Sequence, residues 1–365
     1  TTEIYTLSLH DALPICGGSG GHVIPATIFY EHLKNKFDVF FTVDKRGAKF
    51  LNLEKYKVTV IDTPKLTNNL FLLPLNFFGF FSSIIKSLIF FKKNKIDILI
   101  STGGYMSLPF CIIAKILNIK IYLFEPNMVL GRANNFFVKY CRKIFCYSNE
   151  IVNFPIKYIN RILLIDPLLR KEFYSIIPNN KKTINEEITL LIIGGSQGAK
   201  LFDNELKNTI IEISKKHKLN IYQQTDFSNI KNLKNFYNEN KIYYQLFSFE
   251  ENIINLISKA NLCITRAGAS TLSELTYLNV PYLAIPYPLA KDNHQYQNAL
   301  FYKNKDCCWI LQQDQLKNKV LANFLINIIN DKDDYLNKKK NMEKFSYKNT
   351  WNNINEKLVN TINEN

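Results

Sequence analysis

Short apolar runs alternate with helix-length segments along the chain. Strands of a buried parallel sheet have this form, because helices cover both faces of the sheet and connect each strand to the next. The pattern predicts an α/β fold with two doubly wound, Rossmann-like sheets, in domains 1–165 and 166–345, and a terminal amphipathic helix in 346–365. The predicted strands are residues 39–43, 58–61, 96–100, 121–124, 144–147, 189–193, 219–223, 242–244, 262–265 and 282–285.

Each predicted domain contains a glycine-rich turn that leads into a helix. Residues 16–22 read Cys-Gly-Gly-Ser-Gly-Gly-His, and residues 194–199 read Gly-Gly-Ser-Gln-Gly-Ala. Small residues let the backbone approach a phosphate, and the start of a helix offers free N–H groups. The alternative is a plain strand-to-helix turn. The first loop lacks the G-x-G-x-x-G spacing and the acidic strand end that follows it, which disfavours a nicotinamide cofactor.

A third stretch of this kind leads from the strand 262–265 through small residues into a helix. Glu274 lies about one turn into that helix, where its carboxylate can accept hydrogen bonds from ribose hydroxyls. Thr271 and Glu274 also have the spacing of a capping box, in which both side chains serve only the helix start. The next strand, 282–285, leads to a polar cluster that contains His294 and Gln295.

Polar residues also end two strands of the first domain. Tyr105 follows the strand 96–100, and Glu125 and Asn127 end the strand 121–124. The carboxyl ends of parallel strands meet at one edge of a sheet, where ligands bind in doubly wound folds. We expect a ligand between the two halves, with His22 at the first helix start as a candidate general base.

Composition limits the classes of partner. The net charge of +15 favours an anionic partner, such as a nucleic acid, an acidic membrane or a phosphorylated substrate, although the lysines are spread thinly. The seven cysteines include no Cys-x-x-Cys pair, which is typical of buried thiols in a reducing cytoplasm. The five histidines form no metal-binding motif, so we expect neither a metal nor a cofactor.

The most apolar stretch of the chain is residues 70–91. Pro74, Asn76, Gly79 and Lys86 interrupt it, which favours a buried helix over a transmembrane span. Its aromatic end is expected to rest on an anionic bilayer through phenylalanines near several lysines. The expected membrane residues are Phe77, Phe78, Phe80 and Phe81.

Residues 1–15 fit the pattern poorly. They lack the positive start of a signal peptide, and Pro14 cannot donate a hydrogen bond in a central strand, so no first strand is expected there. Residues 7–15 resemble translated sequencing-adapter sequence. Our hypothesis is that a native first strand has been replaced, which resequencing of the gene end would test.

Taken together, these motifs resemble those of the family 28 glycosyltransferases with the GT-B fold. The resemblance runs from about Cys16 to the last helix, and it depends on the order and spacing of six motifs. These are residues 17–22, 103–105, 125–127, 194–199, 266–274 and 292–299. It implies inverting, metal-independent transfer of N-acetylglucosamine from UDP-GlcNAc to the C4 hydroxyl of lipid I, which gives lipid II for peptidoglycan and cell-wall synthesis.

The resemblance also implies roles for particular residues. His22 and Glu125 are the implied catalytic residues, with His22 the first candidate for the base and Glu125 the second. Acceptor contacts are implied for Gly18, Tyr105 and Asn134. Donor contacts are implied for Ser19, Gly20, Gly21, Asn127, Arg170, Ser196, Glu250, Ala269, Ser270, Thr271, Leu272, Ser273, Glu274 and Gln295.

Three positions depart from the family pattern. Phe124 and Pro126 flank Glu125 where the family usually has histidine and glutamine. The segment from Asp166 to Arg170 is one residue longer than the family's Asn-Pro-x-Arg, and His294 stands where glutamine is common. The extra residue in this segment mainly affects where Arg170 lies relative to the predicted donor site.

The implied partners are UDP-GlcNAc, lipid I in the bilayer and an anionic membrane surface, with no nucleic acid. The implied location is the cytoplasmic face of the bacterial inner membrane, to which the protein binds peripherally. Two alternatives remain open, namely another lipid glycosyltransferase such as a diacylglycerol glycosyltransferase, and a non-catalytic nucleotide-sugar-binding subunit.

Overall fold

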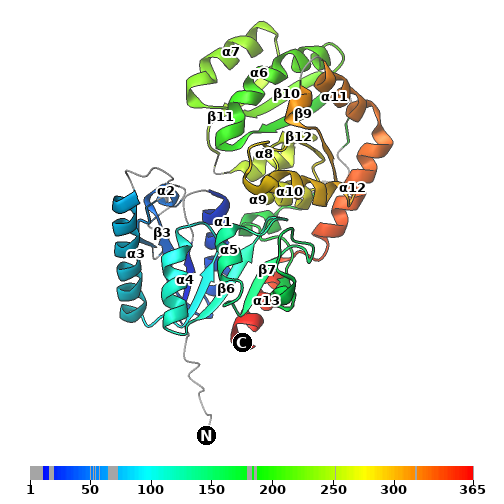
Figure 1. The fold of residues 1–365 in the computed structure, drawn as a ribbon. Coiled ribbons are helices and arrows are strands. Elements are labelled where there is room, and N and C mark those ends of the chain that lie inside the picture. The colour runs from blue at the N-terminus through cyan, green and yellow to red at the C-terminus, as the bar shows by residue number, and fades with distance from the viewer. Residues whose placement is uncertain are drawn as a thin grey trace. The chain divides into compact units, whose positions relative to one another are not determined.

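The chain folds into two units, each built on its own parallel sheet. The computed structural model describes residues 11–15, 20–49, 51, 53, 55–56, 58–64, 73–178, 183–184, 187–250, 252–316 and 319–364, with only the backbone for 11–15, 73–75 and 195–199. The N-terminal unit comprises residues 1–170 and 351–365, and the C-terminal unit comprises residues 171–350. Figure 1 shows their helices and strands. The predicted α/β fold with two parallel sheets is confirmed.

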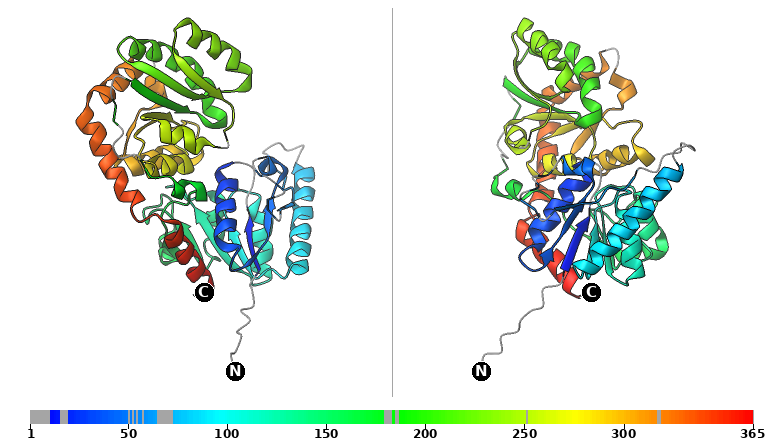
Figure 2. Two further views of the ribbon diagram at one scale, coloured as in Figure 1. Left: turned by 180° about the vertical axis from the view of Figure 1, so that it is seen from behind. Right: turned by 90° about the vertical axis from the view of Figure 1, so that its left-hand side faces the viewer.

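The sheet of the N-terminal unit has the strand order β4-β3-β1-β5-β6-β7-β8, with β2 also paired to β1. Its strands are β1 (Asp11–Ile15), β2 (Asp38–Val39), β3 (Phe41–Val43), β4 (Val58–Val60), β5 (Ile98–Ser101), β6 (Lys120–Glu125), β7 (Lys143–Cys146) and β8 (Ile162–Leu164). The strand order reverses between β1 and β5, so the helices on the two sides of this point cover opposite faces. Figure 2 shows α1 (Gly20–Leu33) on one face and α3 (Leu73–Lys93) with α4 (Ser107–Ile116) on the other.

The expectation that residues 1–15 contain no strand is wrong. Residues 11–15 form β1, a central strand whose Pro14 lies opposite Ile100 of β5. On the other side, β1 pairs with β2 at Asp11 and Ala12 and with β3 at Ile15. Phe40 belongs to neither β2 nor β3, and by the register of the two pairings it is level with Leu13, the residue before Pro14. A residue without an N–H can therefore be accommodated on the β2–β3 side of the strand, where the ladder is interrupted. Whether the sequence here is native stays a hypothesis.

The sheet of the C-terminal unit has the order β11-β10-β9-β12-β13-β14. Its strands are β9 (Glu187–Ile193), β10 (Lys218–Gln224), β11 (Tyr243–Phe247), β12 (Leu262–Thr265), β13 (Tyr282–Ala284) and β14 (Cys308–Ile310). Its order reverses between β9 and β12. The helices are α6 (Gly195–Ser214), α7 (Ile230–Glu239), α8 (Ile253–Lys259), α9 (Ala269–Tyr277), α10 (His294–Lys303), α11 (Val320–Asn330) and α12 (Lys332–Ser346).

The terminal helix predicted in 346–365 is α13 (Trp351–Glu364), which follows α12 in the sequence. Although α13 follows the C-terminal unit in the sequence, it packs in the N-terminal unit beside α1. The Trp351 ring stacks on His32 with ring centroids 3.6 Å apart. Ile354, Leu358 and Ile362 pack into the same hydrophobic core as Phe29 of α1. Figure 1 shows this red helix beside β7.

The helix predicted within residues 70–91 is α3, but its expected burial is wrong for one face. Ser83, Ser87 and Phe91 are buried, because this face of the helix is turned toward the rest of the N-terminal unit, where α3 contacts α4. The opposite face is exposed at Phe77, Phe78, Phe81, Ile85 and Ile89, whereas Phe80, the fourth expected membrane residue, is only half-buried beside it. In the described part of the chain, no helix has the length and apolarity needed to cross a bilayer.

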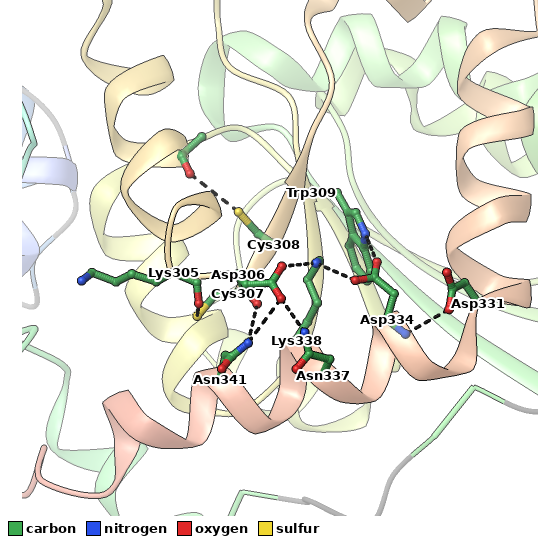
Figure 3. Close-up of polar contacts among 11 residues, drawn as sticks. Lys305, Asp306, Cys307, Cys308, Trp309, Asp331, Asp334, Asn337, Lys338 and Asn341 are labelled. Atoms are coloured by element: carbon green, nitrogen blue, oxygen red, sulfur yellow. Dashed lines mark hydrogen bonds and ion pairs between the residues drawn. The ribbon is translucent and has the colours of Figure 1, made fainter.

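A network of charged and polar side chains fixes α12 against β14 (Figure 3). The buried ammonium of Lys338 donates to Asp306 Oδ1 at 2.6 Å and to Asp334 Oδ1 at 2.9 Å. Its Nζ lies 5.0 Å from the ring centre of Trp309, and Trp309 Nε1 donates to Asp334 Oδ2 at 2.7 Å. The two carboxylates raise the pKa of Lys338 against the opposing effect of burial.

We expect Lys338→Met to lower the free energy of unfolding by about 1–3 kcal/mol, because it leaves two neighbouring carboxylates without their shared cation. Because the folded pKa of Lys338 is raised, the effect is present at neutral pH and is lost as pH rises past the ordinary lysine value of 10.5 and through the folded pKa. Urea denaturation measures it. Lys340→Met, at an exposed position on the same helix, is the control, and equal shifts for both variants would contradict this account.

Candidate functional site

His22 connects the two central strands of the N-terminal unit at their carboxyl ends. It lies in the first turn of α1, and its Nδ1 is 2.7 Å from the carbonyl oxygen of Thr102, which follows β5. A carbonyl oxygen can only accept, so Nδ1 holds the proton and Nε2 has a free lone pair. Thr102 Oγ1 donates back to the His22 carbonyl oxygen at 3.0 Å. The ring is therefore held in the tautomer that a general base requires.

Two glycines make room for the His22 ring. Gly103 and Gly104 have φ values of +90° and +80°, which side chains with a Cβ rarely adopt. A Cβ on either would lie 3.3 Å from an atom of the imidazole. The sequence Gly103-Gly104 is thus required both by the turn and by the close approach of His22.

The Glu125 carboxylate is buried and organises the loop that follows β6. Its Oε1 accepts from the backbone N–H of Asn127 at 3.2 Å and from Asn127 Nδ2 at 2.9 Å. Its Oε2 accepts from the Gly131 N–H at 2.8 Å and from Asn134 Nδ2 at 2.9 Å. Four hydrogen bonds occupy the accepting positions of a carboxylate. This geometry favours His22 over Glu125 as the base and makes Glu125 a positioning residue for Asn127 and Asn134.

Asn134 has one hydrogen-bonding atom left over. Its Nδ2 donates to Glu125 and to the carbonyl oxygen of Phe124 at 2.9 Å. Its Oδ1 is buried without a partner among the described residues, and the whole residue is only 3% exposed. Buried acceptors normally have partners, so this oxygen marks a place where a ligand or a water donates. Asn134 also lies beside Gly103, whose added Cβ would be 3.7 Å from Nδ2.

Tyr105 packs against Arg46, a residue that sequence reasoning missed. The guanidinium carbon of Arg46 lies 4.9 Å from the centre of the Tyr105 ring. Asp44, buried at the end of β3, pairs with Arg46 and also accepts from the Gly47 N–H at 2.8 Å. The Tyr105 hydroxyl is buried, and the nearby Arg46 guanidinium is the group that can donate to it, although without the geometry of a full hydrogen bond. Burial is the largest effect on the pKa of Tyr105, which is raised.

We expect Tyr105→Phe to change the free energy of unfolding by less than about 1 kcal/mol, because within the fold the lost hydroxyl has only a poorly aligned contact with Arg46. If this hydroxyl binds the acceptor, as the sequence predicts, the same variant raises the KM for the acceptor and not that for the donor. Thermal unfolding and initial rates measure the two effects. A clear loss of stability would show that the hydroxyl is bonded within the fold.

In the C-terminal unit, two helices begin at the adjacent carboxyl ends of β9 and β12. The N-caps of α6 and α9 are Gly194 and Gly268, and a glycine has no side chain with which to cap the helix. Free N–H groups and the helix dipoles favour an anion at such positions. The alternative interpretation, a capping box of Thr271 and Glu274, does not hold, because α9 begins two residues before Thr271, which therefore lies inside the first turn.

The predicted donor residues of α9 differ in their positions along the helix. Ala269, Ser270 and Thr271 form the first turn of the helix. Leu272 is buried and its N–H donates to the Gly268 carbonyl oxygen at 3.0 Å, while Ser273 Oγ donates to the Ala269 carbonyl oxygen at 2.9 Å. These two residues thus serve the helix and the core. Glu274 is buried one turn further along.

Gln295 ties two loops together with its side-chain oxygen. Gln295 Oε1 accepts from the N–H groups of Ala267 at 3.2 Å and of Tyr287 at 2.9 Å. Its amide N–H₂ group is then the end that can contact a ligand, and it can only donate. In neighbouring His294, Nδ1 donates to the Lys291 carbonyl oxygen at 2.8 Å.

For the other predicted site residues, the structure shows few contacts, or the residue is not among those that the structure describes. Gly20 and Gly21 form the first turn of α1 next to His22. Arg170 is half-buried at the end of the N-terminal unit, and Glu250 Oε1 accepts from the Asn252 N–H at 2.9 Å. Gly18 and Ser19 lie outside the described residues, and Ser196 is described only as backbone within α6. No cluster of three His, Cys, Asp or Glu side chains fit to hold a metal occurs within the described ranges.

Comparison with known proteins agrees with these motifs. The family model for the glycosyltransferase family 28 N-terminal domain matches residues 14–146, and that for the family 28 C-terminal domain matches residues 189–354. The crystal structure of Acinetobacter baumannii MurG has a TM-score of 0.76 and 22% identity, over 98% of this chain and all of that one. At that identity the likeness shows a shared fold.

Two relatives have the name UDP-N-acetylglucosamine–N-acetylmuramyl-(pentapeptide) pyrophosphoryl-undecaprenol N-acetylglucosamine transferase. The protein from Pelagibacter ubique (strain HTCC1062) is 56% identical over 349 residues, covering 96% of this chain and 98% of the relative. That from Rickettsia bellii (strain RML369-C) is 34% identical, covering 90% and 94%. From both domain matches and these full-length similarities, the chain belongs to glycosyltransferase family 28.

Proposed function

We propose that the protein transfers N-acetylglucosamine from UDP-GlcNAc to the undecaprenyl-diphosphoryl-N-acetylmuramoyl-pentapeptide known as lipid I, and so forms lipid II for peptidoglycan. The main support is the 56% identity, over 96% of the chain, to the Pelagibacter transferase whose name states this reaction. The geometry agrees, because the N-terminal unit holds the His22 ring by a hydrogen bond from Nδ1, and the C-terminal unit has two helices whose N-caps are glycines.

The reaction is an inverting displacement. The C4 hydroxyl of the acceptor attacks the anomeric carbon of the donor sugar, the bond to the UDP oxygen breaks, and Nε2 of His22 takes the hydroxyl proton. Negative charge grows on the departing diphosphate. The N–H groups of residues 269–271, with the start of α6, stabilise that charge because their dipoles are already fixed by the fold. In this proposal no metal or resident cofactor takes part, so turnover persists in excess EDTA.

The loop organised by Glu125 serves the substrates. Glu125 orients Asn127 toward the transferred sugar, and it holds Asn134 so that the unpartnered Oδ1 accepts from the acceptor. The donor ribose is assigned to Glu274 and the sugar hydroxyls to the Gln295 amide group. Arg170, Ser196 and Glu250 complete the donor residues in this proposal.

The protein works at the cytoplasmic face of the inner membrane as a peripheral protein. The exposed apolar stripe of α3, which consists of Phe77, Phe78, Phe81, Ile85 and Ile89, is the proposed contact. Lys86, Lys92, Lys93 and Lys95 are exposed on or just after the same helix and suit an anionic lipid surface. Such a stripe keeps the enzyme close to an acceptor whose lipid tail stays in the bilayer.

A transfer assay with radiolabelled UDP-GlcNAc tests the proposal. We expect label in a lipid II product when lipid I is supplied, and none when diacylglycerol is supplied. Label in diacylglycerol would assign the protein to a different lipid glycosyltransferase. Binding of UDP-GlcNAc without transfer to either lipid would identify a non-catalytic nucleotide-sugar-binding protein.

A further inference from the structure

Arg46 lies in a short segment that is fixed from both sides at the carboxyl end of β3. Asp44 directly follows the strand, and its Oδ1 accepts from the Gly47 N–H at 2.8 Å. A Cβ on Gly47 would lie 2.5 Å from a neighbouring side chain, so this position requires glycine. On the other side, the Lys45 N–H donates to Asp62 Oδ1 at 2.9 Å. These contacts hold the backbone that carries Arg46 in one place.

The guanidinium of Arg46 is held at its inner edge and on one face. Its Nε donates to Asp44 Oδ2 at 3.0 Å, and its Nη2 pairs with the same oxygen. Its charged carbon lies 4.9 Å from the centre of the Tyr105 ring. The outer edge, formed by Nη1 and Nη2, has no acceptor in hydrogen-bonding geometry among the described residues. Such an edge presents two parallel N–H groups, which match the two oxygens of a carboxylate.

The alternative is that Arg46 only neutralises the buried Asp44. The Arg46 side chain is 43% exposed, and an ion pair with a partner in water contributes little stability. A structural pair also explains only the inner edge of the guanidinium. Beside that guanidinium, the Tyr105 hydroxyl is buried without a full hydrogen bond, although buried polar atoms normally have partners. An acceptor atom from outside the chain would satisfy both groups.

Tyr105 connects Arg46 to the proposed base. It follows Gly104, and a Cβ on Gly104 would lie 3.3 Å from the His22 imidazole. In the proposed reaction, His22 takes the proton of the C4 hydroxyl of the acceptor sugar. The peptide of the acceptor is attached through the lactyl group on C3, next to C4, whereas the diphosphate is on C1 at the other end of the sugar ring. A group near His22 is therefore better placed for the peptide.

The charge of this segment also suits a carboxylate better than a diphosphate. Lys45 Nζ pairs with Asp62 Oδ2 at 2.8 Å, and Arg46 pairs with Asp44, so two carboxylates balance the two cations. A diphosphate is favoured by an excess of positive charge. A single carboxylate instead gains most from a planar pair of donors, which the outer edge of Arg46 offers.

We propose that Arg46 binds a carboxylate of the acceptor's peptide stem and so helps to select the acceptor. The Tyr105 hydroxyl lies beside the guanidinium and donates to the same group. This inference rests on the proposed function and deepens it by assigning a residue that recognises the peptide. It also gives the Asp44 pair a second role, because that pair turns the outer edge of the guanidinium away from the protein.

Initial rates with two acceptors test the proposal, namely lipid I and lipid I whose peptide carboxylates have been converted to amides. We expect Arg46→Gln to raise the KM for lipid I about tenfold, with kcat and the KM for UDP-GlcNAc within about twofold. Amidation raises the KM of the unaltered protein by a similar factor. It raises that of Arg46→Gln by less than about twofold, because the partner of the carboxylate is already absent.

Two further variants serve as controls. Arg46→Lys keeps the charge without the planar pair of donors, so its KM for lipid I lies between those of the unaltered protein and Arg46→Gln. Lys45→Gln removes the neighbouring charge, which pairs with Asp62 and is 80% exposed, and it leaves the KM for both acceptors within about twofold.

The outcomes separate the possible failures. If Arg46→Gln raises the KM for both acceptors by the same factor, Arg46 acts on another part of the acceptor, such as the diphosphate, and the inference is overturned. A loss of thermal stability with an unchanged acceptor KM would show a purely structural pair. Amidation that leaves the KM of the unaltered protein as it was overturns the inference without any variant. If the unaltered protein transfers no sugar to either acceptor, the proposed function itself fails.

Discussion

We expect His22→Ala to lower kcat about 10²- to 10⁴-fold while leaving the KM for UDP-GlcNAc within about threefold. The hydrogen bond from Nδ1 to the Thr102 carbonyl oxygen leaves Nε2 as the basic atom. Removal of that atom forces the attacking hydroxyl to lose its proton to water. Initial rates at saturating lipid I measure the effect.

Two further variants separate loss of the base from loss of structure. In His22→Asn, the side-chain amide can still donate to the Thr102 carbonyl oxygen, but it has no basic nitrogen, so we expect the same low kcat. His217→Ala removes a histidine between α6 and β10, at the amino edge of the C-terminal sheet, and is the control. If His22→Asn keeps more than a tenth of the normal turnover, His22 is not the base.

Replacing Phe77, Phe78 and Phe81 together with serine is expected to weaken binding to anionic vesicles about 10³-fold or more, because each inserted phenylalanine contributes roughly 1.5–3 kcal/mol. These three side chains are 72%, 77% and 54% exposed on one face of α3. Co-sedimentation with phosphatidylglycerol vesicles measures the effect. Neutral phosphatidylcholine vesicles should bind the unaltered protein more weakly, because the neighbouring lysines then lack a partner.

The matched control replaces exposed phenylalanines elsewhere. Phe227 and Phe249 of the C-terminal unit are 82% and 63% exposed, and their change to serine should leave vesicle binding as it was. The α3 variant should also keep its kcat with a water-soluble acceptor analogue of short lipid chain. Unchanged sedimentation of the α3 variant would remove this helix from the membrane contact.

The sequence predicted both sheets and most of their strands, because long runs such as 189–193 are apolar and clearly bounded. It missed β8 and β14, which have only three residues each, and it joined β2 to β3 across Phe40. For residues 11–15, the rule that proline disfavours a central strand led to the wrong prediction that no strand forms there. The rule applies only where the partner strand is continuous, and that is a property of the assembled sheet.

For the site, the motifs and the family resemblance predicted His22, Asn134 and Glu274, but they could not show what the atoms of these residues contact. The free Oδ1 of Asn134 is visible only once its Nδ2 bonds are known. Likewise, only the structure shows that hydrogen bonds within the fold occupy both carboxylate oxygens of Glu125. Arg266 belongs to the motif 266–274, and sequence alone does not show that its side chain is buried.

The return of α13 to the N-terminal unit has a consequence for synthesis on the ribosome. Residues 351–364 are made after the whole C-terminal unit, yet they supply Ile354, Leu358 and Ile362 to the first core and the ring that stacks on His32. The core surface that α13 covers in the N-terminal unit therefore stays exposed while about 180 further residues are translated and fold. During that interval the nascent chain is most exposed to aggregation and to proteases, and a stop codon just before Trp351 would make the interval permanent.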